Sequence, residues 1–310
     1  MNPRDLILLA AAGLMASTLL AAPVALPLGK SQLEFIDQRG DPTRPVTVWM
    51  FVPDTCDHKC PLQFVMHGVK RNGEEYLDNW VEFAKARKFI VAVPEFTRKY
   101  FPKDEDYSLG RSIAEPDPAK WAFSVPEHLF DELKSRHGFE AQTYRMFGHS
   151  AGGQFVHRLH LFNPAHRANP IIAANPGWYT LPEWGIDKTP YKFPYNTIGS
   201  RVDTMIARQA LSRPFVLMLG DKDTDASDPS LNKSVGANEQ GRHRLARGEY
   251  FYGAATIAAK NLGVKFAWQK RYVNGAGHDN AHMAAAAVEM MYAPLVAASS
   301  TPAHQALLKK

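Results

Sequence analysis

The fold is decided by the segment Gly148-His149-Ser150-Ala151-Gly152-Gly153, in which a serine stands in the pattern G-x-S-x-G. A strand-like run precedes it at residues 144–147, and residues 154–159 after it have a helical composition. A strand, a sharp turn and a helix in this order leave the serine hydroxyl exposed at the carboxyl edge of a sheet. Only small residues fit beside such a turn, and Gly148 and Gly152 avoid side chains that would collide with the strand and the helix. The Ala151 N–H then lies at a helix N-terminus, where a developing negative charge is favoured.

Other strand-like runs alternate with helical patterns on both sides of this segment. Several runs are continuously apolar, which is typical of strands buried on both faces of a parallel sheet. We predict strands at residues 46–52, 62–66, 89–93, 144–147, 171–174, 215–219 and 265–273. One apolar helical stripe is formed by Tyr76, Leu77, Trp80, Val81 and Ala84.

Three further helices are predicted from their ends and composition. Ser124 and Glu127 match a capping box, and Gly138 is placed to end the helix that follows them. Residues 249–262 and 282–296 are also helical in composition. The alternation predicts a single α/β domain with a mostly parallel sheet and helices on both faces.

The sequence resembles the α/β-hydrolase superfamily over nearly all of residues 30–300. Besides the serine turn, Phe64-Val65-Met66-His67-Gly68-Val69 is similar to the strand of that superfamily that ends in His-Gly at the oxyanion loop. The resemblance implies the α/β-hydrolase fold. It also implies an oxyanion hole built from the backbone N–H groups of Val69 and Ala151.

A narrower resemblance rests on residues 67–72 together with Tyr76 and Trp80. This part resembles exported bacterial esterases similar to poly(3-hydroxybutyrate) depolymerases and feruloyl-esterase-like enzymes. It implies a carboxylic ester as the substrate.

A serine hydroxyl needs a general base, and the superfamily places it last along the chain, after the serine and the acid. His278 lies in a glycine-rich loop directly after the predicted strand that ends at Val273, where the resemblance places the base. His282 is the main alternative. Three other histidines lie on or just after the helix behind the serine and cannot face its hydroxyl: His157, His160 and His166.

The acid is expected in the loop after the predicted strand at residues 215–219. The G-x-x-D pattern of the superfamily selects Asp223, which would accept a hydrogen bond from the base and fix its tautomer. Asp221 and Asp225 remain alternatives. These three carboxylates also invite a calcium site, but Ala226 and Asn232 stand where an EF-hand needs glycine and glutamate. A solvated acidic turn and a calcium site of another kind both stay open.

An aromatic and proline-rich stretch at residues 175–213 interrupts the alternation of strands and helices. It could cover a cleft like a cap, or it could be an ordinary packed excursion. On the first interpretation, we expect Trp178, Tyr179 and Trp184 to shape the substrate pocket. Arg242, Arg244 and Arg247 form a small basic cluster, interpreted as a solvated helix start, with contact to an anionic substrate as the alternative.

The first 22 residues read as a secretory signal peptide, because an apolar run at residues 6–22 follows Arg4 and precedes Pro23. The alternative is an uncleaved anchor helix, for which the run is short. The catalytic domain is then expected over residues 27–300. The only cysteines, Cys56 and Cys60, predict a disulfide in an oxidising compartment. Free thiols or a metal pair with His58 are the alternatives, but a zinc site needs about four ligands.

These observations predict an exported serine esterase, periplasmic or secreted, that cleaves small or polymeric esters through Ser150, His278 and Asp223 by an acyl-enzyme route. We expect no cofactor, no metal and no stable membrane insertion after signal cleavage. The sequence indicates no oligomeric state. A serine peptidase or amidase on the same fold and a non-catalytic binding protein are the alternatives. Nucleic acid is not an expected partner, because 36 basic against 31 acidic residues give a net charge of only +5 and no basic tract with interleaved aromatics appears.

Overall fold

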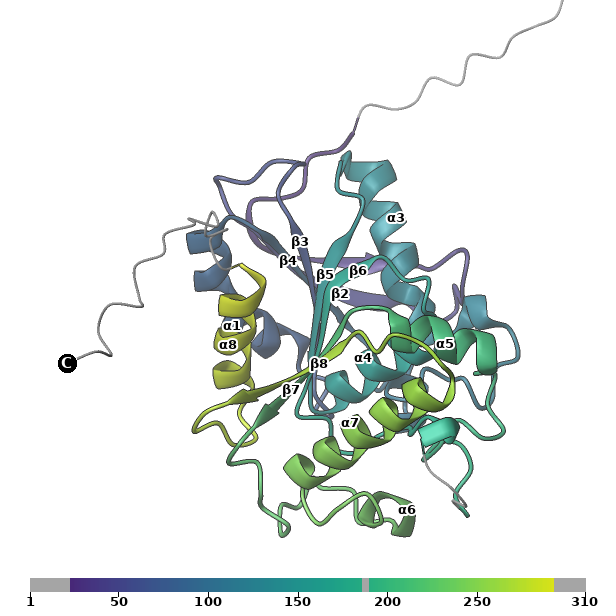
Figure 1. The fold of residues 1–310 in the computed structure, drawn as a ribbon. Coiled ribbons are helices and arrows are strands. Elements are labelled where there is room, and N and C mark those ends of the chain that lie inside the picture. The colour runs from purple at the N-terminus through teal and green to yellow at the C-terminus, as the bar shows by residue number, and fades with distance from the viewer. Residues whose placement is uncertain (1–22, 186–189, 293–310) are drawn as a thin grey trace, which may run out of the picture.

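The computed structural model describes residues 23–185 and 190–292 of the 310-residue chain. These residues form an eight-stranded sheet in the order β1-β2-β4-β3-β5-β6-β7-β8 (Figure 1). The strands are β1 (Gly29–Phe35), β2 (Val46–Val52), β3 (Leu62–Met66), β4 (Ile90–Glu95), β5 (Tyr144–His149), β6 (Ala168–Ala174), β7 (Phe215–Gly220) and β8 (Trp268–Val273).

The sheet is parallel from β4 to β8, and β2 alone runs against its neighbours on both sides. Parallel strands bring their carboxyl ends to one edge of the sheet. The loops that follow β3, β5, β7 and β8 therefore emerge at the same edge, and these are the loops that carry the predicted site residues.

Helices cover both faces of the sheet (Figure 1). On one face, α1 (Gly73–Arg87) and α8 (Asn280–Met291) contact each other and share one apolar cluster with the sheet. The other face carries a larger cluster under α3 (Val125–His137), α4 (Ala151–Phe162), α5 (Thr204–Ser212) and α7 (Arg244–Asn261). The short elements are α2 (Asp104–Tyr107), α6 (Val235–Asn238) and the 3₁₀ turns η1 (Pro118–Lys120), η2 (Ala122–Ser124) and η3 (Glu183–Gly185).

The predicted apolar stripe is confirmed as the buried side of α1. Trp80 is fully buried, and its ring centroid lies 5.2 Å from that of Phe147 on β5. Burying a large apolar side chain contributes about 1.5–3 kcal/mol. This packing fixes α1 beside the strand that leads into the serine turn.

Several sequence predictions need correction at element ends. β1 was not predicted, α7 begins at Arg244 rather than at residue 249, and the last strand begins at Trp268 rather than at residue 265. α8 covers Asn280–Met291, and residues 293–296 of the predicted helix lie outside the described residues.

The predicted capping box at the start of α3 is wrong. Ser124 has helical φ and ψ and makes no cap, because its hydroxyl donates to the Pro118 carbonyl. Glu127 turns inward instead, accepting hydrogen bonds from the Tyr144 hydroxyl and from the Arg167 side chain. Gly138, in contrast, is confirmed as the left-handed end of this helix, with φ 71°.

The segment between β6 and β7 is the predicted excursion, and its described part packs against the body of the protein. Tyr179 and Leu181 are buried in the larger apolar cluster. The segment also contains α5, which the sequence did not predict and which Asp203 caps by accepting from the Ile206 N–H at 2.8 Å. Residues 186–189 lie outside the described residues.

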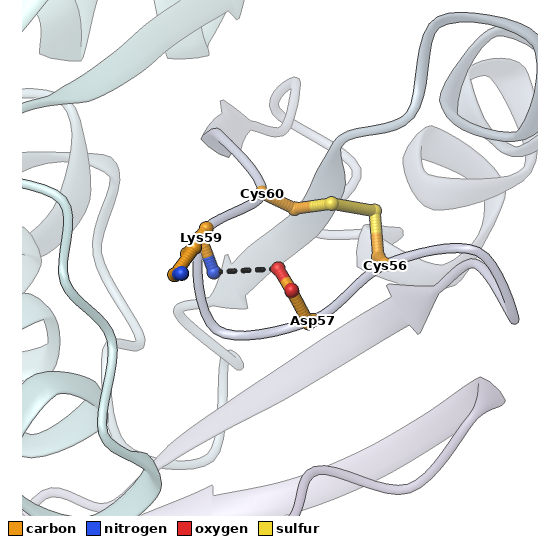
Figure 2. Close-up of a disulfide and its surroundings, with 4 residues drawn as sticks. All are labelled: Cys56, Asp57, Lys59 and Cys60. Atoms are coloured by element: carbon orange, nitrogen blue, oxygen red, sulfur yellow. Dashed lines mark hydrogen bonds between the residues drawn. A yellow bond between two sulfur atoms is a disulfide. The ribbon is translucent and has the colours of Figure 1, made fainter.

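The predicted disulfide between Cys56 and Cys60 is confirmed, and Figure 2 shows that it closes a short turn. Inside the turn the Asp57 carboxylate accepts from the Lys59 N–H at 2.8 Å. His58 does not join the sulfurs, because its Nε2 lies 3.2 Å from a carboxylate oxygen of Glu140. Across residues 23–185 and 190–292, no three or more His, Cys, Asp or Glu side chains are grouped so that they could hold a metal ion.

The predicted signal peptide lies outside the described residues. Of the helices that are described, none has the length and apolar character to cross a membrane.

Candidate active site

Ser150 occupies a strained turn between β5 and α4. Its φ of 58° and ψ of −116° are outside the regions that residues with a side chain usually adopt. The turn is held by its own N–H, which donates to the Ala174 carbonyl at the end of β6 at 3.0 Å. The backbone of this turn therefore fixes the position from which the Ser150 side chain extends.

The glycines around Ser150 are required by close backbone contacts. A Cβ at Gly152 would lie 2.0 Å from the Met66 carbonyl oxygen on β3, and a Cβ at Gly148 would lie 2.3 Å from the Gly152 carbonyl oxygen. Both distances are far below van der Waals contact. The reason for the glycine spacing inferred from the sequence is therefore confirmed.

A continuous chain of hydrogen bonds joins Ser150, His278 and Asp223. The Nε2 atom of His278 lies 2.9 Å from the Ser150 hydroxyl oxygen, and its Nδ1 lies 2.8 Å from a carboxylate oxygen of Asp223. Asp223 is only 2% exposed. When Nδ1 carries the proton, Nε2 is free to accept the serine proton, so the arrangement can increase the nucleophilicity of Ser150.

The alternative residues lie elsewhere in the same loops. A carboxylate oxygen of Asp221 accepts the Gly275 N–H at 2.8 Å, and the exposed Asp225 bonds Ser227. His282 is exposed in the first turn of α8, where its N–H is capped by Asp279. The three aspartates therefore bond different partners, and among the described residues they do not form a group that could hold a metal ion.

The two predicted oxyanion residues lie beside the serine. Val69 and Ala151 line one cavity of about 90 Å³ together with Ser150. Ala151 is the first residue of α4, so its N–H has no acceptor within the helix. Either amide could stabilise a negative charge that develops on a bound carbonyl oxygen.

The buried His67 holds the oxyanion loop, which begins at Gly68 and Val69, in place through two hydrogen bonds. Its Nδ1–H donates to the Gly68 carbonyl at 2.9 Å, and its Nε2 accepts the Phe96 N–H at 3.0 Å. Complete burial lowers the pKa of His67 to about 3. A neutral ring is needed here, because a protonated one could not accept from Phe96.

His149, the second residue of the G-x-S-x-G pattern, packs against the ring of His278. The two ring centroids are 4.6 Å apart, and the His149 Nδ1 lies 3.2 Å from the Tyr76 hydroxyl. Burial, with the nearby His278 and Arg244 as smaller causes, lowers the pKa of His149 well below its ordinary value. The uncharged ring of His149 therefore packs against the ring of His278 and limits its movement.

Asn175 was not singled out from the sequence, although it connects two loops of the site. It follows β6 with a left-handed φ of 43°. Its amide NH₂ donates to the Gly277 carbonyl at 3.0 Å, and its amide oxygen accepts the Gly220 N–H at 2.7 Å. The loop that bears His278 is therefore tied to the loop that bears Asp223.

The interpretation of the basic cluster as a solvated helix start is wrong for two of its three members. Arg242 is exposed, but Arg244 and Arg247 are almost completely buried. The Arg244 guanidinium lies 3.5 Å from the Asp223 carboxylate and 2.9 Å from that of Asp228. Burial alone would raise the pKa of Asp228, but hydrogen bonds led by that of Arg244 outweigh it and hold this pKa well below its usual range.

Of the three aromatic residues expected to shape the pocket, only Trp178 lines the cavity beside Ser150. Tyr179 and Trp184 are not among the residues that line it. Tyr179 is fully buried behind the cavity, where it stacks on Phe251 with a centroid distance of 4.4 Å. Trp184 belongs to η3, which packs against α7.

Two solved structures are similar to this chain over most of their length. Poly(aspartic acid) hydrolase-1 from Sphingomonas sp. KT-1 is 35% identical, with a TM-score of 0.80, and the match covers 86% of this chain and 99% of that chain. The poly(3-hydroxybutyrate) depolymerase LpqC from Bordetella parapertussis is 30% identical, with a TM-score of 0.79 and coverage of 86% and 91%.

An S-formylglutathione hydrolase from Agrobacterium tumefaciens has the same fold at 16% identity, with a TM-score of 0.54 and coverage of 86% of this chain and 95% of that chain. No protein-family model and no curated protein matches the sequence. The two stronger similarities confirm the predicted fold and a hydrolase activity. The chain therefore belongs to the α/β-hydrolase superfamily, among the esterase-like serine hydrolases that include this poly(aspartic acid) hydrolase and this poly(3-hydroxybutyrate) depolymerase.

Proposed function

We propose that this protein is an exported serine esterase that hydrolyses carboxylic esters through Ser150, His278 and Asp223. The observation that carries the proposal is the unbroken hydrogen-bond chain from the buried Asp223 to the Ser150 hydroxyl. Chemistry of this kind needs only protein groups. The relative named as a poly(3-hydroxybutyrate) depolymerase supports an ester as the substrate.

In the first half of the reaction, the Ser150 oxygen attacks the ester carbonyl carbon while His278 Nε2 takes the serine proton. The carbonyl oxygen becomes an oxyanion, which the N–H groups of Ala151 and Val69 stabilise. The C–O bond to the alcohol then breaks, and His278 returns the proton to the leaving oxygen. An acyl group remains bound to Ser150.

In the second half, water replaces the alcohol. His278 takes a proton from water as the water oxygen attacks the acyl carbon, and then returns a proton to Ser150 as the carboxylic acid leaves. Asp223 holds the imidazole in the productive tautomer and stabilises its protonated form.

The test uses a fluorophosphonate probe and p-nitrophenyl butyrate. We expect the purified protein to take up one probe on Ser150, located by mass spectrometry of the labelled peptide, and to lose ester hydrolysis when labelled. Ser150→Ala should lose at least 10³-fold in kcat. Ser135→Ala, on the exposed side of α3, is the matched control and should keep full activity.

Absence of an adduct on Ser150, or full activity of the Ser150→Ala variant, would reject the proposal. Absence of both labelling and hydrolysis in a folded protein would instead support the non-catalytic binding protein.

Amide hydrolysis is the second candidate, and the relative named as a poly(aspartic acid) hydrolase favours it. Poly(aspartic acid) is a polyamide, and the same acyl-enzyme chemistry can cleave an amide. Rates on p-nitrophenyl esters, peptide anilides, poly(3-hydroxybutyrate) films and poly(aspartic acid) would separate the two. A larger kcat/KM for an amide than for its matched ester would replace the esterase with an amidase.

The proposed export is supported by the disulfide, because such bonds persist in oxidising compartments. Cell fractionation should place the protein in the periplasm or the medium, and N-terminal sequencing should show a start near residue 23. A cytoplasmic protein that still begins at Met1 would contradict export without affecting the hydrolase chemistry.

A further inference from the structure

The peptide group between Gly68 and Val69 carries the second oxyanion donor. Because a peptide group is planar, its carbonyl and its N–H are fixed relative to each other. The Gly68 carbonyl accepts two hydrogen bonds, from the His67 Nδ1–H at 2.9 Å and from the Arg71 N–H at 3.2 Å. The Val69 N–H bonds no residue in the described part of the chain, and Val69 lines the cavity beside Ser150. The two donors to the carbonyl therefore set the direction of this N–H.

Those two donors belong to residues that bind the same residue further along the chain. The Phe96 N–H donates to His67 Nε2 at 3.0 Å, and the Phe96 carbonyl accepts from Arg71 Nη1 at 2.6 Å. His67 and Arg71 stand two positions before and two positions after Val69. Both ends of the loop that presents Val69 are thus attached to one residue directly after β4.

The Arg71 side chain also binds the segment that leads into α2. Its Nη2 donates to the Lys103 carbonyl at 3.0 Å, and its guanidinium carbon lies 4.6 Å from the centre of the Tyr107 ring. Tyr107 in turn stacks on His67 with a centroid distance of 4.4 Å and donates its hydroxyl to the His67 carbonyl at 2.8 Å. Arg71 is 5% exposed and Tyr107 is 1% exposed. Residues 96–107 therefore form a buried support for the oxyanion loop.

The partners of Arg71 indicate that its position matters more than its charge. Its guanidinium binds two backbone carbonyls, and among the described residues its only ion pair is with Asp104 at 3.7 Å, whose side chain is 62% exposed. The Arg71 backbone has a left-handed φ of 60°, which is uncommon for a residue with a side chain. The buried side chain thus holds in place a turn that its own backbone does not favour.

We propose that Arg71 is a positioning residue of the oxyanion hole, because its buried side chain fixes the peptide group that presents the Val69 N–H. Tyr107 supports the same peptide group through His67. The inference rests on the proposed function, since an oxyanion forms only if Ser150 attacks a carbonyl carbon.

Two substitutions of Arg71 separate position from charge. Arg71→Met keeps an unbranched side chain against Tyr107 but removes the bonds to both carbonyls. Loss of an oxyanion donor commonly costs about 10²–10³ in kcat, so a displaced Val69 N–H should lower kcat/KM for p-nitrophenyl butyrate about 10- to 100-fold. Arg71→Lys keeps the charge without the planar fork that binds the two carbonyls, and its kcat/KM should fall by a similar factor.

A transition-state analogue shows whether the oxyanion hole itself is affected. With propyl trifluoromethyl ketone, the Ser150 oxygen bonds to the ketone carbon, the serine proton passes to His278 Nε2, and the carbonyl electron pair stays on oxygen as an oxyanion. In each Arg71 variant, Ki for this ketone should rise by the same factor as kcat/KM falls. Ki for butyrate, which forms no such adduct, should change less than about threefold.

Two further variants complete the test. Tyr107→Phe keeps the ring and removes only the hydrogen bond to the His67 carbonyl, so kcat/KM should fall about three- to tenfold with a matching rise in Ki for the ketone. Arg145→Met is the matched control, because this arginine also stacks on a tyrosine, 4.2 Å from the ring centre of Tyr292, but lies at the start of β5, away from the site. It should leave kcat/KM and Ki unchanged.

Wild-type kcat/KM in folded Arg71→Met or in Arg71→Lys would overturn the inference, as would a fall in kcat/KM without a matching rise in Ki for the ketone. If both Arg71 variants fail to fold, wild-type kcat/KM and Ki in Tyr107→Phe would overturn it. All of these results need an active wild-type enzyme. They are therefore distinct from failure of the proposed function, in which wild-type Ser150 takes up no fluorophosphonate and no ester is cleaved.

Discussion

Replacement of Arg244 by glutamine tests how the buried acid is held in place. The guanidinium contacts the Asp223 carboxylate at 3.5 Å, the Asp228 carboxylate at 2.9 Å and the Ser230 hydroxyl at 2.8 Å. At an effective dielectric constant of about 20, the attraction between Arg244 and Asp223 alone is about 5 kcal/mol before the cost of desolvation. Removing one partner from a buried ion pair usually costs about 3–5 kcal/mol in stability.

Two separate effects are therefore expected of Arg244→Gln. The melting temperature should fall by about 10 °C, since each kcal/mol corresponds to about 2–4 °C in a chain of this size. The value of kcat/KM should fall about 10- to 100-fold, because Asp223 loses a contact that holds it toward His278.

Arg247→Gln is the matched control. Arg247 is one turn further along α7 and equally buried, but its guanidinium donates to the carbonyls of Gly177, Gly241 and Asn232 rather than to either carboxylate. Thermal melting and kcat/KM for p-nitrophenyl butyrate are measured on both variants. We expect Arg247→Gln to lose stability while its kcat/KM stays close to the wild-type value. If Arg244→Gln loses only stability and keeps the wild-type kcat/KM, Arg244 does not position Asp223.

Three further predictions concern stability. Burial keeps the pKa of both His67 and His160 at about 3, whereas these histidines take up protons near pH 6.5 in the unfolded chain. The free energy of unfolding should therefore be at its full value above pH 6.5. Below that pH it should fall by about 1 kcal/mol per histidine for each pH unit. Urea unfolding at pH 7, 6 and 5 measures this, and a constant midpoint would contradict it. Gly152→Ala should cost at least about 3 kcal/mol or prevent folding, since its Cβ meets the backbone of β3. Gly253→Ala on α7 has open space around the new Cβ and should stabilise by about 0.5–1 kcal/mol; equal thermal melts for the two would refute the steric argument. Replacing both Cys56 and Cys60 by serine should lower the free energy of unfolding by about 2 kcal/mol, the value expected for so short a loop. Dithiothreitol should lower the melting temperature of the wild type but not that of the double variant.

The serine turn could be predicted from the sequence because its causes are local. The direction of Ser150 is determined by the strand before it, the glycines near it on both sides and the start of the helix after it. All of these lie within ten residues of Ser150. His278 and Asp223 could be located because each follows a strand in a loop whose spacing the family resemblance defines.

The rest of the site depends on contacts between distant segments, which a single sequence does not reveal. Arg244 resembles any arginine at a helix start, and its burial follows from how α7 lies over the loop of Asp223. Nothing in the residues around Asn175 indicates that its side chain spans two loops. Trp178 and Tyr179 are neighbours, yet only the path of the chain after β6 shows which of them faces the cavity.

At the ends of secondary structure elements, tertiary contacts outweighed local signals. β1 was missed because its alternating polar residues resemble a surface segment, although they pair along the whole of β2. The capping box failed because Glu127 binds Tyr144 and Arg167 instead of the helix start.

Asn175 gives the acid and the base a common anchor, because one amide group holds the loop of each. When the edge of the sheet fluctuates, the two loops should shift together. The distance between the Asp223 carboxylate and the His278 imidazole should then vary less than the distance of either group from Ser150. Loop insertions that spare this amide, such as one in the exposed turn at residues 225–227, should then be tolerated. A change at Asn175 itself would release both loops at once.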